Sequence, residues 1–191
     1  SIISSVLPFL IPAVIVIAVI VVLCSGYLKA PPDMAYLISG VGKKPRILIG
    51  KAGIKIPFFE RVDRLFLGAI QIDVKTSSSV PTAEFINVKV DAVAKVRVKP
   101  DADGIRLAAK NFLNMTTSQV SSELRPTLQG NMREIVGTLD LKTLNTNRED
   151  FSKKVLESAA PDMDKLGIEI LSFNIQSITD EKGLIEDLGA D

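Results

Sequence analysis

The chain has 191 residues and a mass of 20.7 kDa, with 47% hydrophobic residues, 24% charged residues and a formal net charge of +1. Its 23 Lys and Arg residues balance 22 Asp and Glu residues, and no basic stripe with interleaved aromatic residues occurs, so the sequence does not predict nucleic-acid binding. Histidine is absent and cysteine occurs once, which excludes an intrachain disulfide and removes the commonest general base and metal ligand.

A long apolar segment opens the chain. The first charged side chain is Lys29, so residues 1–28 carry no ionised side chain. In a helix, the residues from Val6 to Cys24 would rise roughly 28 Å, close to the ~30 Å hydrocarbon thickness of a bilayer. A cleaved secretory signal is the alternative, because small residues occur from Cys24 to Gly26 and at Ala30. The length favours a transmembrane anchor, whose predicted residues are Ala13, Val14, Ile15, Val16, Ile17, Ala18, Val19, Ile20, Val21, Val22 and Leu23.

The two ends of this segment carry further signals. Pro8 and Pro12 each lack a backbone N–H, so the regular helix is expected to begin near Pro12. Cys24 at the membrane edge is a candidate for reversible palmitoylation, and the alternative is a small apolar residue of the helix. A lipoprotein site is not predicted, because Leu23 stands where a small residue is needed.

Basic residues follow the apolar segment. Lys29, Lys43, Lys44 and Arg46 stand against a single acid, Asp33. Because basic flanking residues are retained on the cytoplasmic side, the folded part of the chain is expected to face the cytoplasm.

Short strands separated by turn residues are predicted after the anchor, at residues 34–39, 46–49, 54–59 and 65–74. In the third of these, Pro57, Phe58 and Phe59 have two interpretations: contact with the lipid interface near the membrane exit, or burial in an ordinary core. The sequence alone does not decide between them.

The clearest pattern lies at residues 85–98. Apolar residues occupy every even position from Val88 to Val98, and nearly all the odd positions between them are polar. Alternation with a period of two over this length predicts a strand with one face on a core and one face in water.

Helical spacing follows that strand. Asp101 is predicted to cap a first helix, Thr116 or Thr117 to start a second that Pro126 kinks or restarts, and Asn147 to cap a third. A strand at 168–178 and a short helix after Asp180 close the chain. Strands followed by helices and a last strand predict an α+β domain with the helices on one side of the sheet.

No catalytic, cofactor-binding or metal-binding residues are predicted. With the single cysteine inside the apolar segment, a zinc site and a thiol nucleophile are excluded. Ser-Lys or carboxylate-pair catalysis stays open, but no spacing argues for it. The glycine-rich stretch at 40–44 lacks the leading glycine and the Ser or Thr of a phosphate-binding loop and predicts a hairpin turn.

Several stretches resemble flotillins. PDMAYLISG at 32–40 resembles the opening of the family's folded region; NREDFSKKV at 147–155, AAPD at 159–162 and LGIEILSF at 166–173 resemble a later block; and LIEDLG at 184–189 is similar to the end of that region. The resemblance covers residues 31–191, although the helix around Pro126 fits it less well.

This resemblance implies an N-terminal transmembrane helix followed by an SPFH domain, also called a band 7 or prohibitin-homology domain. The implied divisions are an anchor at 1–28, a strand-rich, membrane-proximal first subdomain at 29–80, an α+β second subdomain at 81–180, and the start of a C-terminal helix or coiled coil at 181–191. It also implies that the chain is a fragment, or the ordered part, of a longer protein.

The implied function is that of a non-enzymatic scaffold, with no cofactor, which assembles with copies of itself into large rings or cages and organises membrane microdomains. Its expected partners are membrane lipids and other copies of the chain. The alternative is a regulator that sequesters or controls a membrane protease or another membrane client protein.

Overall fold

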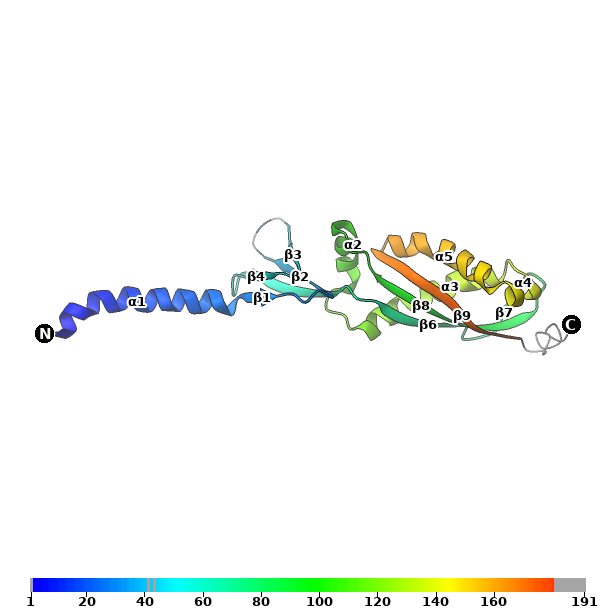
Figure 1. The fold of residues 1–191 in the computed structure, drawn as a ribbon, viewed down its shortest axis with the longest axis horizontal. Helices are drawn as coiled ribbons and strands as arrows, with labels where there is room; N and C mark the ends of the chain where they lie inside the picture. Colours follow the sequence, from blue (N-terminus) through cyan, green and yellow to red (C-terminus); the bar gives the residue numbers. More distant parts are fainter. Residues whose placement is uncertain (1, 41, 43, 181–191) are drawn as a thin grey trace. The chain divides into compact units, whose positions relative to one another are not determined.

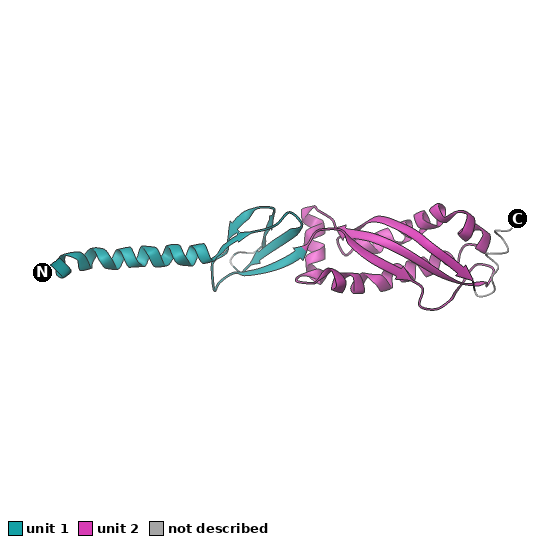
Figure 2. Cartoon of the chain, turned by 60° about the horizontal axis from the view of Figure 1, so that its bottom comes forward, with its two compact units in different colours: residues 1–65 teal, residues 66–191 magenta. Residues whose placement is uncertain are grey.

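The computed structural model describes residues 2–40, 42 and 44–180. The chain forms two compact units, residues 1–65 and residues 66–191, which have separate colours in Figure 2. The division expected at residue 80 falls inside the second unit, because the strand at 70–75 pairs with the long strand of that unit. The helix expected at 181–191 and the family-like stretch at 184–189 lie outside the described residues.

Unit 1 begins with a single long helix, α1 (Ile2–Ser25), at the blue end of the ribbon in Figure 1. The helix begins at Ile2 and not near Pro12, and both Pro8 and Pro12 lie inside it. A proline removes one N–H donor, but its φ angle suits a helix, and the surrounding hydrogen bonds continue the helix on both sides.

The remainder of unit 1 consists of short strands: β1 (Tyr27–Lys29), β2 (Met34–Ser39), β3 (Arg46–Ile49), β4 (Ala52–Ile54) and β5 (Arg61–Phe66). β1 pairs with β4 in a two-stranded sheet, and β2 lies between β3 and β5 in a three-stranded sheet. The buried side chains of Ala35, Leu37, Ile38 and Leu65 form its core. The predicted strands at 34–39 and 46–49 are confirmed, whereas the strand predicted at 54–59 is wrong beyond Ile54, where the chain turns.

Within residues 66–180, unit 2 is built on a sheet of four strands: β6 (Ile70–Lys75), β7 (Val80–Pro81), β8 (Asn87–Val98) and β9 (Ile168–Asp180). β6 and β7 pair with successive parts of one edge of β8, and β9 pairs with its other edge, in every case antiparallel. The alternation predicted for β8 is confirmed, because every even position from Val88 to Val98 is buried. The strand expected at 65–74 is divided between β5 and β6 by a break around Gly68.

Two irregularities in β9 keep its apolar side chains on the buried face. The register between β8 and β9 shifts twice, and Leu171 and Gln176 are left without a partner residue in β8. Each extra residue reverses the alternation of side chains along the strand. As a result Ile168, Phe173 and Ile178 are all buried, although no strict period of two connects them.

Four helices complete the described part of unit 2: α2 (Ala102–Phe112), α3 (Thr117–Val136), α4 (Leu141–Thr146) and α5 (Arg148–Asp164). The side chains of Asp101, Thr116 and Asn147 cap the helices as predicted, and Thr116 forms a reciprocal capping box with Gln119. Pro126 does not restart α3, which runs through it, and α4 was not predicted.

Helices α3 and α5 pack against the sheet of unit 2, as Figure 1 shows. α5 contacts β9, and α3 contacts β6 and α5. Leu128, Met132, Phe151 and Val155 on these two helices are completely buried. The fold is therefore the α+β class predicted from the order of the elements.

Candidate membrane-contact site

Helix α1 has an apolar surface on all sides. None of its residues is buried, and the large anchor side chains from Val14 to Leu23 are between 46% and 61% exposed. Its 24 residues span about 36 Å. Among the residues that the structure describes, α1 is the one helix long and apolar enough to cross a membrane, although a signal sequence would have the same composition. A helix that is apolar on every side requires an apolar environment.

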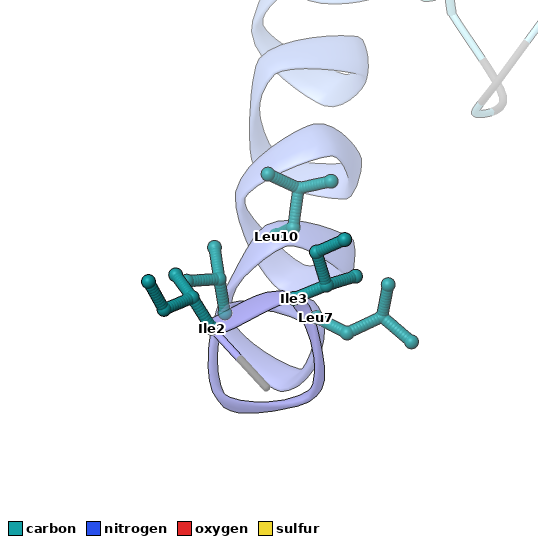
Figure 3. A pocket seen from close by; sticks show the side chains of 5 residues that line it. Ile2, Ile3, Leu7 and Leu10 are labelled. Carbon is teal, nitrogen blue, oxygen red and sulfur yellow. The ribbon is translucent and has the colours of Figure 1, made fainter.

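Figure 3 shows the N-terminal end of α1, where the side chains of Ile2, Ile3, Leu7 and Leu10 project from the ribbon. The shallow hollow between them is lined only by aliphatic side chains of this single helix. Such a surface offers no polar group that could orient a small molecule, but it is suited to contact with lipid chains.

The chain leaves α1 through a tight junction that places the end of β4 beside the end of the helix. The Gly26 N–H donates to the Leu23 carbonyl at 3.1 Å, and the Lys55 N–H donates to the Gly26 carbonyl at 2.8 Å. A Cβ atom at Gly26 would lie 2.0 Å from the Lys55 carbonyl oxygen, so only glycine fits here. Next along the two strands, Tyr27 pairs with Ile54. Residues 54–55 are thereby fixed beside the C-terminal end of α1.

The segment that follows is a compact turn, residues 56–60, which we call the aromatic turn. The N–H groups of Phe59 and Glu60 both donate to the Ile56 carbonyl, at 3.3 and 3.0 Å. Phe58 is 98% exposed and Phe59 is 72% exposed, which rules out the ordinary-core interpretation of these two side chains. Pro57 is half-buried. The structure thus brings together the three residues predicted from the sequence.

Three further apolar side chains of unit 1, in the aromatic turn or in the strand pair that precedes it, are exposed. Tyr27 is 58% exposed, Ile54 is 49% exposed and Ile56 is 44% exposed. Sequence reasoning missed Ile54 and Ile56 because both were assigned to the strand predicted at 54–59, and it counted Tyr27 only as part of the apolar segment 1–28. Aromatic residues with aliphatic neighbours are typical of the membrane interface.

An ion pair between the half-exposed Arg46 and the buried Glu60 lies at the base of the aromatic turn. The side chain of Glu60 is only 2% exposed, and the Arg46 guanidinium donates to its two carboxylate oxygens at 2.8 and 2.9 Å. The Ile56 N–H donates to Oε1 of Glu60 at 2.8 Å, and Arg46 also donates to the Ile54 carbonyl at 3.1 Å. The Ile56 N–H, with help from Arg46, lowers the pKa of Glu60 below its ordinary value, although burial partly opposes this effect. Sequence reasoning counted Arg46 only as a flanking charge and did not identify Glu60.

Cys24, the candidate for acylation, lies in the last turn of α1 and is exposed. The adjacent Ser25 hydroxyl donates to the Val22 carbonyl at 2.6 Å and extends the hydrogen bonding at the helix end. The thiol is therefore at the end of the apolar helix, beside the junction with β1.

Comparison with known proteins is consistent with this arrangement. The family described as SPFH domain / Band 7 family matches residues 28–191. The chain belongs to this family. Its relatives include "Flotillin-like protein FloT" of Bacillus subtilis (strain 168), with 30% identity over 187 residues, and "Flotillin-1" of Drosophila melanogaster, with 28% identity over 166 residues. "Flotillin-2a" of Danio rerio is 39% identical over 110 residues.

These alignments cover 92%, 86% and 58% of this SPFH chain, respectively. They cover only 36%, 39% and 26% of the relatives, so the chain spans well under half the length of each. The flotillin-like relationship predicted from the sequence is confirmed. Together with α1, it supports a membrane-associated SPFH scaffold.

Proposed function

We propose that this SPFH chain is the membrane-anchored part of a scaffold that assembles with copies of itself and organises microdomains in the membrane. α1 crosses the bilayer once, and the strands of unit 1 that follow it, together with unit 2, face the cytoplasm. The observation that supports this most directly is the direct connection of a 24-residue apolar helix, none of whose residues is buried, to an SPFH fold. Lys29, Lys44 and Arg46, which follow the helix, favour the cytoplasmic orientation.

Self-assembly does not require a strong contact between two copies. Confinement to a membrane raises the effective concentration of neighbours, so weak side-by-side contacts are sufficient to close a ring. Unit 2 provides an extended surface for such contacts, because in the described part of the chain the 13-residue strand β9 pairs with β8 along one edge only. A closed ring would restrict lateral diffusion of the lipids that it encloses.

The aromatic turn and Cys24 are proposed to add membrane contacts. Phe58 and Phe59 enter the lipid interface beside the end of α1, with Pro57 stiffening the turn that carries them. Palmitoylation of Cys24 adds a second apolar anchor at the same level. Both contacts favour retention of unit 1 at the membrane surface.

Amine-reactive cross-linking of the full-length protein in its native membrane tests the scaffold. We expect a ladder of species beyond the dimer, and rings or closed patches when the same membranes are imaged. Dispersed monomers would refute self-assembly. A membrane client that copurifies in stoichiometric amount, without a homo-oligomer, would favour the regulatory alternative. Digestion of the compact units by protease added outside intact cells would refute the cytoplasmic orientation.

A further inference from the structure

The aromatic turn carries an unfavourable backbone conformation at its most exposed residue. Phe58 has a φ angle of +70° and a side chain that is 98% exposed. This left-handed region suits glycine, and a bulky residue adopts it only when the surrounding structure enforces it. Folding of unit 1 alone gives no packing benefit from this phenylalanine, because its side chain contacts almost nothing. Its conformation is consistent with a role outside the folded chain.

The surrounding structure enforces the turn through the ion pair beneath it. Glu60 holds one end of the turn and its carboxylate accepts the Ile56 N–H at the other end, so the side chain closes the loop across its base. Arg46, at the start of β3, binds the same carboxylate through two hydrogen bonds and fixes it to the three-stranded sheet. Burying a carboxylate is unfavourable unless all its oxygens are satisfied, as they are here.

The backbone of the turn is also supported from below. Gly40 has a φ angle of +132°, and a Cβ atom there would lie 2.2 Å from the Phe59 carbonyl oxygen and 3.0 Å from the Cα of Glu60. The turn therefore rests directly on the chain at the end of β2. The backbone at Gly40 supports the turn on one side, and the ion pair closes its base. The side chains of Phe58 and Phe59 therefore project from the turn.

The membrane lies on the side to which α1 runs. The Lys55 N–H bonds to the Gly26 carbonyl, one residue beyond α1, so the turn begins within a few residues of the helix end. A helix that spans the hydrocarbon ends among the lipid headgroups. Exposed aromatic side chains at this level are stable at the boundary between headgroups and acyl chains.

We propose that Arg46 and Glu60 are positioning residues, which hold the aromatic turn as a preformed wedge whose Phe58 and Phe59 side chains occupy the headgroup and acyl boundary of the leaflet at which α1 ends. This inference rests on the proposed function, since it requires α1 to cross the bilayer. Because the turn is ordered before it meets lipid, membrane contact requires little further loss of conformational freedom.

The chain is well suited to a direct test, because it contains no tryptophan. In Phe58→Trp, the new indole is the single tryptophan of these 191 residues. The 191-residue variant is reconstituted into vesicles whose acyl chains carry bromine, which quenches tryptophan on contact, and into otherwise identical vesicles without bromine. We expect a blue-shifted emission and strong quenching by brominated lipid. Phe85→Trp is the matched control, because Phe85 is 87% exposed and also has a positive φ angle, +61°.

The positioning role is tested in the Phe58→Trp background. Glu60→Gln keeps an acceptor for the Ile56 N–H but loses the charge that binds Arg46, whereas Glu60→Ala removes both. Quenching should therefore decrease in the order Glu60, Gln, Ala, while resistance of the protein to carbonate extraction stays unchanged because α1 is intact. A residue that supported only folding would change the unfolding midpoint without this graded loss of lipid contact.

Each contrary outcome has a distinct meaning. Equal quenching in all three proteins would overturn the positioning role of Glu60 and Arg46. Unquenched tryptophan at position 58, or equal quenching at position 85, in a chain that still resists carbonate would overturn the wedge and leave the scaffold proposal standing. Extraction of the unmodified chain by carbonate would instead refute the proposed anchor.

Discussion

Replacing glycine by alanine at two positions of unit 2 should change its stability in opposite directions. Gly130 lies inside helix α3, is exposed, and a Cβ atom there meets no atom within 4 Å. Alanine is more stable than glycine in a helix interior by about 0.5–1 kcal/mol, because its unfolded chain has less conformational freedom to lose. Gly130→Ala should raise the free energy of unfolding by this amount.

Gly167, in the turn between α5 and β9, should respond in the opposite way. Its φ angle is +73°, and a Cβ atom would lie 2.2 Å from the Gly104 carbonyl oxygen and 2.8 Å from the Ala108 nitrogen. The left-handed conformation alone costs a non-glycine residue about 1–2 kcal/mol. Because both contacts are with the backbone of α2, that helix must move, and overpacking of this kind adds about 1–3 kcal/mol. Gly167→Ala should therefore destabilise unit 2 by about 2–5 kcal/mol.

Amide hydrogen exchange of the β8 peptides measures this difference, because β8 is the central strand of unit 2 and exchanges when the unit unfolds. The full-length chain in detergent is compared with the two variants under identical conditions. A thermal scan should show corresponding midpoint shifts, about 2–4 °C for each kcal/mol in a chain of this size. Shifts of the same sign in the two variants would refute the reasoning from local geometry.

Three further predictions concern the anchor, the core and the ion pair. The double variant Val16→Arg with Ile20→Arg places two charges within α1, and each charge costs about 2.5–3.5 kcal/mol at the centre of a membrane helix. The variant chain should therefore become extractable by carbonate. Retention of the variant in the membrane would count against α1 as the anchor. Phe151→Ala removes a side chain that is 0% exposed and should lower the unfolding free energy of unit 2 by about 3–5 kcal/mol. Hydrogen exchange in β8 measures this loss, and a loss below about 1 kcal/mol would contradict tight packing of α5. Since the pKa of Glu60 is lowered from 4.5, chiefly by the Ile56 N–H, its contribution to the stability of unit 1 should be complete above pH 4.5 and lost as the pH falls through the lower folded-state pKa. Glu60→Gln should make the free energy of unfolding of unit 1 decrease less as the pH falls. Denaturant unfolding followed by tyrosine fluorescence measures this, because both tyrosines of the chain lie in unit 1. An identical pH profile in the two proteins would show that Glu60 does not contribute.

The features predicted correctly from the sequence depend on short-range patterns. The alternation in β8 spans consecutive residues, and the caps at Asp101, Thr116 and Asn147 each join residues three positions apart. The composition of α1 shows, without reference to any other part of the chain, that it is long and apolar enough to cross a membrane. Structural features that depend only on a few neighbouring residues, such as side-chain alternation and helix capping, can be predicted from the order of those residues.

The features that the sequence did not predict depend on partners far apart in the chain. The two irregularities of β9 are recognised only when it is paired with β8, about 80 residues earlier in the chain. The chain turns after Ile54, because Arg46 and Glu60, 14 residues apart, close the base of the aromatic turn. No local pattern indicates that these two side chains meet.

By itself, the sequence determined the class of the fold and the family and predicted the residues of the anchor, since apolar composition and periodicity act within a single segment. Only the tertiary structure decided that Phe58 and Phe59 are exposed beside the end of α1, and that a buried carboxylate holds them there. It likewise decided that alanine should be favourable at Gly130 and unfavourable at Gly167. The physical reason is the same in both cases: exposure, charge pairing and steric room depend on which distant backbone atoms the fold places nearby.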